Sequence, residues 1–165
     1  MTDATTAIDP RYVSLLWATP EHADEIARVH AMLFPTPWES ASIQQMLNDP
    51  GSVALVAAGG NPRVIGGFVL AQVAADEAEI LTIGVAGPWQ RHGIATRLVE
   101  GAKRAAKKAG AERIFLEVGR RNASAIALYK KAGFAEVGER KGYYTLPDGS
   151  KEDEIGRASC RERVC

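Results

Sequence analysis

Cysteine is nearly absent from this chain of 165 residues, and both copies, Cys160 and Cys165, lie in the last six positions. They belong to residues 154–165 (EIGRASCRERVC), which show no helical or strand period and match, residue for residue, one reading frame of a common short-read sequencing adapter. We interpret this segment as a non-native tail and place the domain in residues 1–153. That domain contains no cysteine, which excludes thiol catalysis, cysteine-ligated zinc and disulfides from its chemistry.

An excess of charge of either sign is also absent. Lys and Arg number 20, as do Asp and Glu, so the formal net charge at pH 7 is +0. No overall field therefore draws the chain to nucleic acid or to an anionic membrane, and we expect neither as a direct partner. No apolar run approaches the length of a membrane span, and the first residues carry no apolar signal core. We expect a soluble, cytoplasmic protein that is a monomer or a weak dimer.

Histidine is scarce and scattered along the chain. His22, His30 and His92 are too far apart to predict a metal cluster, so we expect no metal, and we expect each of the three at the surface or at an interface. Hydrophobic residues, by contrast, make up 46% of the chain, without repeats or low-complexity segments. This composition is typical of one globular domain with a core.

The hydrophobic periodicity predicts alternating strands and helices. Thr19 and Pro20 are typical of a helix start, Asn122 of another, and Gly133 of a helix end that is followed by a strand. The residues GGNP (59–62) separate two apolar runs, which predicts an antiparallel hairpin. The predicted strands span 11–17, 52–58, 63–74, 77–85, 112–118 and 134–144, and the predicted helices span 20–33, 39–48, 93–109 and 123–131.

The order of these elements, βααβββαβαβ, predicts an α/β fold. The succession of strand, helix and strand across residues 77–118 requires a right-handed parallel crossover, whereas the hairpin adds antiparallel pairs, so the sheet is mixed. Gly84 interrupts the strand at 77–85. A glycine inside a strand often marks a bulge or the close approach of another group to the backbone.

The stretch GPWQRHGIAT (87–96) connects a predicted strand to a predicted helix. The small residues Gly93 and Ala95 let a ligand approach the backbone, and the unpaired N–H groups of a first helical turn favour an anion such as a pyrophosphate. Taken alone, the stretch also fits an ordinary turn between a strand and a helix. It is neither a Walker loop, which ends in Lys-Ser or Lys-Thr, nor a Rossmann fingerprint, whose glycines are spaced differently.

Three separated motifs together carry a more specific signal. They are EILTIGV (79–85), QRHGIA (90–95) in the pattern Gln/Arg-x-x-Gly-x-Gly/Ala, and LEVGRRNASAIALYKKAGF (116–134). This combination resembles the GCN5-related N-acetyltransferase (GNAT) family. LEV, Asn122, ALY, GF and the later RKGYY are most similar to its RimI type, the ribosomal-protein-alanine N-acetyltransferases. The resemblance extends from about residue 12 to residue 153 and includes FPTPW (34–38).

The resemblance implies a single domain with a mixed central sheet, helices on both faces, and a splayed parallel pair of strands that holds acetyl-coenzyme A (acetyl-CoA) as co-substrate. In this arrangement strand backbone pairs with the pantetheine arm, loop amides meet the pyrophosphate, and Arg91 adds a charge-assisted contact. Asn122 matches a residue that touches the cofactor in the family, although N-capping alone also explains it. The implied cofactor-binding residues are Ile83, Val85, Arg91, His92, Gly93, Ile94, Ala95, Thr96 and Asn122.

Glu117 and Tyr129 match the general base and the general acid that are proposed for the family. The attacking amine must be neutral, and an α-amine with a reference pKa of about 7.8 loses its proton far more readily than a lysine at about 10.4. Glu117 would accept that proton, Tyr129 would donate one to the departing thiolate, and the N–H of Val85 would stabilise the oxyanion. From the residues alone, an ion pair at the rim for Glu117 and a core position for Tyr129 stay open.

The implied function is transfer of an acetyl group to the α-amine of a protein N-terminus, foremost the alanine of a small-subunit ribosomal protein. A lysine or a small-molecule amine as acceptor, a non-catalytic CoA-binding module and a nucleotide-binding domain remain as alternatives. Tyr143 and Tyr144 fit either the lining of the acceptor cleft or the packing of a core.

Two features depart from the family pattern. Gly119, Arg120 and Arg121 put basic residues beside Glu117, where relatives carry other polar residues, and a basic entrance suits a basic ribosomal acceptor poorly. The tail at 154–165 takes the position of the family's seventh strand, which inserts between two others. We therefore expect that backbone ladder to be lost, at a cost of about 1–3 kcal/mol for each buried polar group left without a partner.

Overall fold

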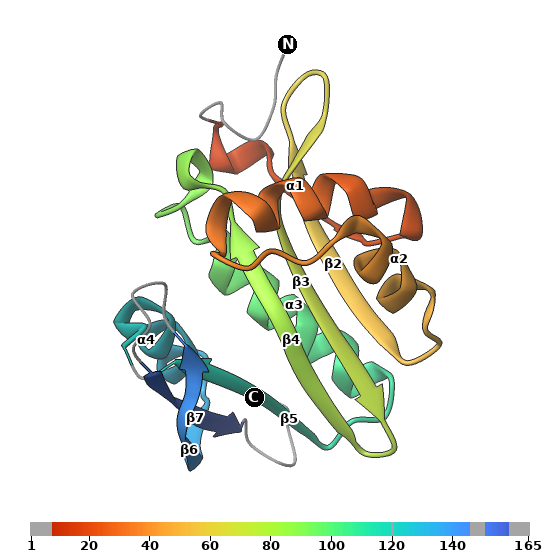
Figure 1. Cartoon of the computed structure of the whole chain (residues 1–165). Coiled ribbons are helices and arrows are strands. Elements are labelled where there is room, and N and C mark those ends of the chain that lie inside the picture. Colours follow the sequence, from red (N-terminus) through yellow and green to blue (C-terminus); the bar gives the residue numbers. More distant parts are fainter. Residues whose placement is uncertain (1–7, 120, 146–150, 159–165) are drawn as a thin grey trace.

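The computed structural model describes residues 8–119, 121–145 and 151–158, with side chains described as far as residue 136. The strands are β1 (Ser14–Trp17), β2 (Ser52–Gly59), β3 (Val64–Ala74), β4 (Glu77–Val85), β5 (Arg113–Gly119), β6 (Ala135–Thr145) and β7 (Lys151–Ala158), and the helices are α1 (Ala23–Leu33), α2 (Ser40–Asn48), α3 (Ile94–Lys108) and α4 (Ala123–Lys131). These strands form one mixed sheet in the order β1-β2-β3-β4-β5-β7-β6. Figure 1 shows α1 and α2 on one face of the sheet and α3 on the other.

The predicted order of strands and helices is confirmed up to β6, and the element ends move by at most three residues. The first strand begins at Ser14 because Asp9 caps a short 3-10 turn, Pro10–Tyr12, in which its carboxylate accepts the N–H of Arg11 at 3.0 Å. A second 3-10 turn, Pro20–His22, precedes α1. The fixed φ of proline suits the first position of both turns.

The core surrounds β2, β3 and β4. Helix α3 turns an apolar stripe toward these strands, with Leu98 and Val99 fully buried, while the basic residues Arg104, Lys107 and Lys108 are exposed. Burial of this stripe fixes α3, and therefore its first turn, relative to β4. Within the described ranges, no helix has both the length and the apolar character to cross a membrane.

Strands β4 and β5 form the predicted parallel pair, but only over a short stretch. Their ladder ends where Ile80 lies opposite Leu116. At this point the β3–β4 register shifts past Leu81, which is a bulge in β4, and beyond it the two strands diverge (Figure 1). Gly84 marks the other predicted feature, a close approach, since a Cβ there would lie 2.7 Å from Leu33 Cδ1.

Strand β7 lies between β5 and β6 and runs antiparallel to both. In the β5–β7 ladder Glu117 lies opposite Gly156 and Gly119 opposite Glu154. The expectation that the backbone ladder is lost where the tail begins is therefore wrong as far as Ala158. These pairs support the carboxyl end of β5 on one edge and leave its other edge to face β4.

Candidate active site

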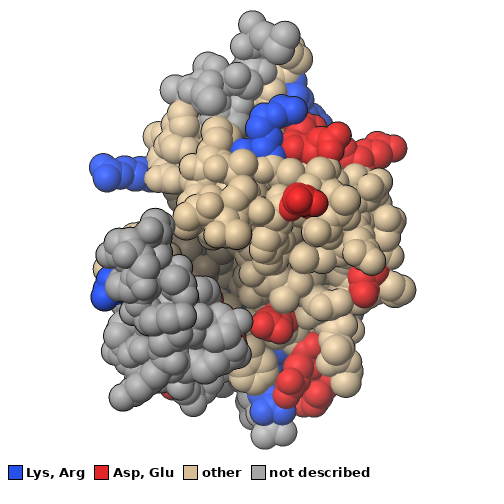
Figure 2. Space-filling view, viewed as in Figure 1, with Lys and Arg blue, Asp and Glu red and all other residues tan. Residues whose placement is uncertain are grey.

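The diverging strands leave a cleft of about 970 Å³ between β4 and β5. Residues 80–85 of β4 line one wall and residues 116–119 of β5 another, while α4, the start of α3 and the end of α1 contribute the remaining lining. Figure 2 shows a hollow beside a largely uncharged stretch of the described surface. A cleft of this size can enclose most of a cofactor-sized ligand.

The open edge of β4 offers backbone groups to this cleft. Ala86 donates its N–H across the ladder to the carbonyl of Gly66 in β3 at 2.8 Å. Because backbone groups along an antiparallel strand point alternately toward and away from the neighbouring strand, those of Val85 and Ile83 point away from β3 and into the cleft. In agreement, Gln90 Nε2 donates to the Val85 carbonyl at 2.8 Å.

The loop before α3 forms an amide-lined mouth of the cleft. Arg91 at φ 65° and Gly93 at φ 76° both adopt left-handed backbone, which turns the chain into the helix. Among the described residues, no side chain caps this helix start, so the N–H groups of residues 94–96 receive no side-chain acceptor from them. A Cβ added at Gly93 would meet no atom of the described part of the chain within 4 Å. The open space in front of the positive end of the helix dipole fits a phosphate group.

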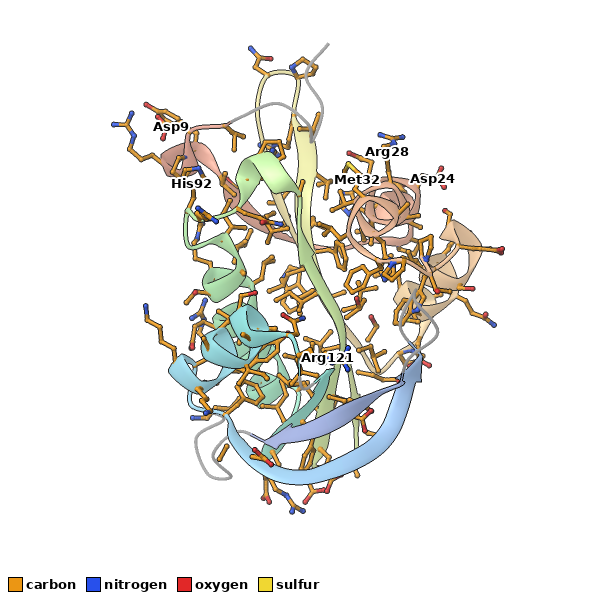
Figure 3. All side chains as sticks on the ribbon, turned by 60° about the vertical axis from the view of Figure 1, so that its left-hand side comes forward. Asp9, Asp24, Arg28, Met32, His92 and Arg121 are labelled. Atoms are coloured by element: carbon orange, nitrogen blue, oxygen red, sulfur yellow. The ribbon has the colours of Figure 1, made fainter. Side chains whose placement is uncertain are left out.

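His92 is the one predicted binding residue that does not line the cleft. It is exposed and lies beside Asp9, as Figure 3 shows. Hydrogen bonds from Arg11 hold the pKa of Asp9 at about 2, and His92 adds a smaller lowering. The structure brings together all other predicted site residues, namely Ile83, Val85, Arg91, Gly93, Ile94, Ala95, Thr96, Glu117, Asn122 and Tyr129.

Glu117 and Tyr129 line the same cleft from neighbouring elements. Glu117 is exposed and is the first β5 residue beyond the parallel ladder. Tyr129 is 5% exposed, and its ring meets Phe134 edge-on with 5.8 Å between the ring centres. Tyr129 therefore belongs to the core and also lines the cleft. A core position and a role as general acid, the two interpretations that the sequence left open for it, are thus compatible. An accessible carboxylate and an enclosed phenol in one cleft can accept and donate a proton.

Helix α4, which carries the phenol, is fixed at both ends. The side-chain oxygen of Asn122 accepts the N–H of Ala125 at 3.2 Å, which confirms the predicted N-cap, and the same residue lines the cleft. At the other end Lys103 of α3, which is 1% exposed, donates from Nζ to the carbonyl of Ala132. Burial lowers the pKa of Lys103. Sequence reasoning did not identify this lysine, because basic residues on a surface helix are usually solvated.

His30 is buried, so the expectation that it lies at the surface or at an interface is wrong. It is 2% exposed, lines the cleft and stacks with Phe34, Trp38 and Phe68 at 4.2, 5.2 and 5.8 Å between ring centres. Burial lowers its pKa. The signal was present in the sequence, because His30 shares the helical spacing of Ile26 and so lies on the apolar stripe of α1.

Some predicted features are exposed, and some lie outside the described residues. Arg121, which the sequence places beside Glu117, is exposed, and so are Lys130 and Lys131 at the end of α4. The predictions for Arg120, Tyr143, Tyr144, Cys160 and Cys165 concern side chains outside those described.

Comparison with known proteins identifies relatives of this chain. Residues 16–134 match the model of the Acetyltransferase (GNAT) family. The [ribosomal protein bS18]-alanine N-acetyltransferase of Escherichia coli (strain K12) is 41% identical over 88 residues, which are 53% of this chain and 59% of that protein. The protein of the same name from Haemophilus ducreyi is 30% identical over 119 residues, 72% of this chain and 80% of that one. An N-alpha-acetyltransferase of Saccharolobus solfataricus is 31% identical over 138 residues, 77% and 83% of the two chains.

The matched region is about 59% of the length of the Escherichia coli relative. The crystal structure of the ribosomal-protein-S18-alanine N-acetyltransferase from Escherichia coli resembles this fold with a TM-score of 0.83 at 26% identity, covering 91% of this chain and 94% of that one. Arabidopsis thaliana NAA60 in complex with acetyl-CoA shares the fold with a TM-score of 0.78 at 23% identity, covering 88% and 97%. These likenesses confirm the predicted fold. The family model matches residues 16–134, which include both walls of the cleft, and the chain therefore belongs to the acetyltransferase (GNAT) family.

Proposed function

We propose that this chain transfers an acetyl group from acetyl-CoA to the α-amine of a protein N-terminus, in the cytoplasm, with the alanine of a small-subunit ribosomal protein as its foremost acceptor. One observation carries the proposal: an amide-lined mouth, an open strand edge, a carboxylate and a phenol all line a single cleft. The relatives support the choice of acceptor, since those from Escherichia coli and Haemophilus ducreyi are named for alanine and the one from Saccharolobus solfataricus for an α-amine.

The chain offers two sets of groups that would hold the coenzyme. When bound, acetyl-CoA supplies an acetyl thioester. The first-turn amides that follow Gly93, together with the side chain of Arg91, are suited to its pyrophosphate. The N–H and carbonyl of Ile83, and the carbonyl of Val85 that also accepts a bond from Gln90, point into the cleft and are suited to the amides of its pantetheine arm.

Two side chains would move the protons. Glu117 accepts a proton from the acceptor's ammonium group, directly or through one water, which leaves the amine nitrogen free to bond to the acetyl carbon. As the bond between carbon and sulfur breaks, Tyr129 would give its phenolic proton to the sulfur, and the second proton that the nitrogen must lose to become an amide would return to the phenolate, directly or through one water. The N–H of Val85 is the backbone donor toward the carbonyl oxygen, on which negative charge develops. The products are an N-acetylated terminus and free CoA.

Mass spectrometry of a peptide panel tests the proposal. The panel varies the first residue and contrasts free N-termini with internal lysines on blocked peptides. We expect alanine-starting termini to react at least about a hundredfold faster than lysines, because near neutral pH far more of an α-amine is unprotonated. Exclusive modification of lysines would contradict the acceptor assignment. Binding of CoA without acetylation of any peptide or small amine would indicate a non-catalytic coenzyme-binding module.

A further inference from the structure

The cleft contains a second polar group that the proposed proton transfers leave unused. His30 lines the cleft from α1, although its side chain is almost wholly enclosed. The rings of Phe34, Trp38 and Phe68 lie nearly parallel to its imidazole, with interplanar angles of 23°, 23° and 26°. Three such contacts fix the orientation of the imidazole.

The hydrogen-bonding state of the imidazole follows from its surroundings. Trp38 donates its backbone N–H to His30 Nδ1 at 3.2 Å, so Nδ1 is an acceptor and the ring hydrogen lies on Nε2. Burial lowers the pKa of His30, which favours this neutral form. The ring can therefore donate a hydrogen bond through Nε2, but it cannot take a proton from an amine at that atom.

Nε2 faces the cleft. The hydrogen bond from Trp38 uses Nδ1 and leaves Nε2 without a hydrogen bond among the described residues. An enclosed Nε2 would then be a buried atom without a partner, and Nε2 is not such an atom. The atom is therefore reached from the cleft that the residue lines. A donor held among three aromatic rings favours a ligand that brings an acceptor oxygen, since a buried donor without a partner is unfavourable.

His30 reaches the cleft from the face of the sheet opposite to the amide-lined mouth. Helices α1 and α3 cover opposite faces (Figure 1), and the mouth lies at the start of α3. A coenzyme whose pyrophosphate is held at that mouth enters from the α3 face. The α1 face, and with it His30, is left for the acceptor.

We propose that His30 is a positioning residue for the acceptor and that its Nε2–H donates a hydrogen bond to the first carbonyl oxygen of an acceptor peptide. In a peptide this carbonyl carbon lies two bonds from the reacting nitrogen. The ε-amine of a lysine and a simple alkylamine have no carbonyl at that distance. The inference rests on the proposed function and deepens it, because it assigns to His30 the preference for α-amines that adjoin a carbonyl.

Two variants and two acceptors test the role of His30. His30→Phe keeps an aromatic ring but removes both nitrogens, whereas His30→Gln keeps an acceptor for the Trp38 N–H and a donor toward the cleft. The acceptors are an alanine-starting peptide and isopropylamine, which resembles alanine in size but lacks the carbonyl. We expect His30→Phe to raise the KM for the peptide about five- to tenfold while kcat changes less than about threefold. His30→Gln should recover most of this loss.

Three further readouts separate positioning from a merely structural role. In His30→Phe the ratio of kcat/KM for the peptide to that for isopropylamine should fall by the same five- to tenfold factor. The pH dependence of kcat/KM should keep its acidic limb, and the Kd for CoA, measured by calorimetry, should stay within about twofold.

Each contrary outcome has a distinct meaning. An unchanged KM for the peptide, an equal loss with isopropylamine, or a parallel loss of CoA affinity would overturn the inference. Loss of the acidic limb would make His30 the base and would overturn it as well. If the unaltered chain binds CoA but acetylates no peptide N-terminus, the proposed function fails and the inference fails with it. If the unaltered chain is active and His30→Phe matches it, the inference alone fails.

Discussion

Gly93 combines a left-handed backbone with a position at the mouth of the cleft. An added Cβ there has no atom within 4 Å in the described ranges, so its structural cost is the positive φ of 76°, about 1 kcal/mol of unfolding free energy. We predict that Gly93→Ala also weakens CoA binding at least about tenfold, because the new methyl group would occupy open space at the mouth where a phosphate would bond the first-turn amides, and such charge-assisted bonds contribute about 1.5–3 kcal/mol. Calorimetric titration measures the affinity, and urea unfolding measures the stability.

Gly110 provides the matched control for this substitution. It has a φ of 99°, lies just beyond the other end of α3, and also has open space around an added Cβ. Gly110→Ala should lose a similar amount of stability but keep its CoA affinity. Equal losses of affinity in the two variants would argue against a phosphate site at Gly93.

The proton transfers predict a separation of turnover from coenzyme binding. We expect Glu117→Gln and Tyr129→Phe each to lower kcat about 10²- to 10⁴-fold, because each removes a group that exchanges a proton in the transition state. Neither change should alter the Kd for CoA by more than about threefold. Steady-state acetylation and calorimetry measure the two effects. Glu112→Gln is the control, since this exposed carboxylate does not line the cleft, and full turnover in Glu117→Gln would refute the role of that residue as the base.

At the scale of elements, the cleft exists because the neighbouring strands β4 and β5 pair with different strands on their outer edges. Beyond Ile80 and Leu116, β4 continues its ladder with β3, while β5 continues its ladder with β7. The outer edges of β4 and β5 are paired with β3 and β7, whereas their inner edges no longer pair with each other beyond this point. These inner edges can therefore bond to a ligand. The bulge at Leu81 lies where this separation begins and increases the local twist.

The attachment of α4 to α3 is a second relation between elements, and it can be tested at Lys103. Its Nζ bonds the carbonyl of Ala132 and lies 5.7 Å from the ring centre of Phe134, which in turn contacts Tyr129. We predict that Lys103→Met lowers the unfolding free energy by about 1–2 kcal/mol, because a helix-end carbonyl loses its donor. The looser helix should also lower kcat several-fold. Urea unfolding and initial rates measure these changes.

Lys107→Met is the control for this prediction, because Lys107 is exposed on the same helix and should tolerate the change. An unaltered unfolding curve for Lys103→Met would show that the buried ammonium contributes nothing net. In that case the free energy gained by removing a desolvated charge equals the free energy lost with the hydrogen bond.

At the scale of the whole molecule, the segment 154–158 completes the sheet whatever its origin. We propose that residues 154–165 are non-native, and we predict that a chain carrying an alternating apolar strand there melts at a higher temperature. Gly156 is a weak strand former, yet it pairs with both neighbouring strands. Deletion of residues 154–165 should be far more harmful, since the ladder groups of two strands lose partners at about 1–3 kcal/mol each against about 5–15 kcal/mol of total stability.

Thermal unfolding and acetylation rates of the three chains measure this prediction. The expected order of melting temperature is restored strand, present chain, deletion. Equal melting temperatures and rates for the first two would show that the tail is tolerated as a strand. Deletion should also reduce turnover, because β7 supports the end of β5 that carries Glu117.

Much of the fold and most of the candidate site could be predicted from short stretches of sequence. Asn122 caps α4 and Gly133, at φ 95°, ends it, each through contacts within a few residues. The loop around Gly93 and the spacing from Glu117 to Tyr129 lie within continuous motifs. Such features depend on local backbone geometry and on the periodicity of apolar residues, which a linear sequence displays directly.

Other features required the packed chain. His92 lies in the predicted motif but outside the cleft lining, and the ring of Phe68, which is distant in the sequence, packs on His30. Lys103 reaches a carbonyl 29 residues away, and the separation of β4 from β5 depends on β7, which is paired from the far end of the chain. These arrangements join residues distant in sequence, so their geometry follows from how whole elements bury their apolar surface and satisfy their backbone, not from any local pattern.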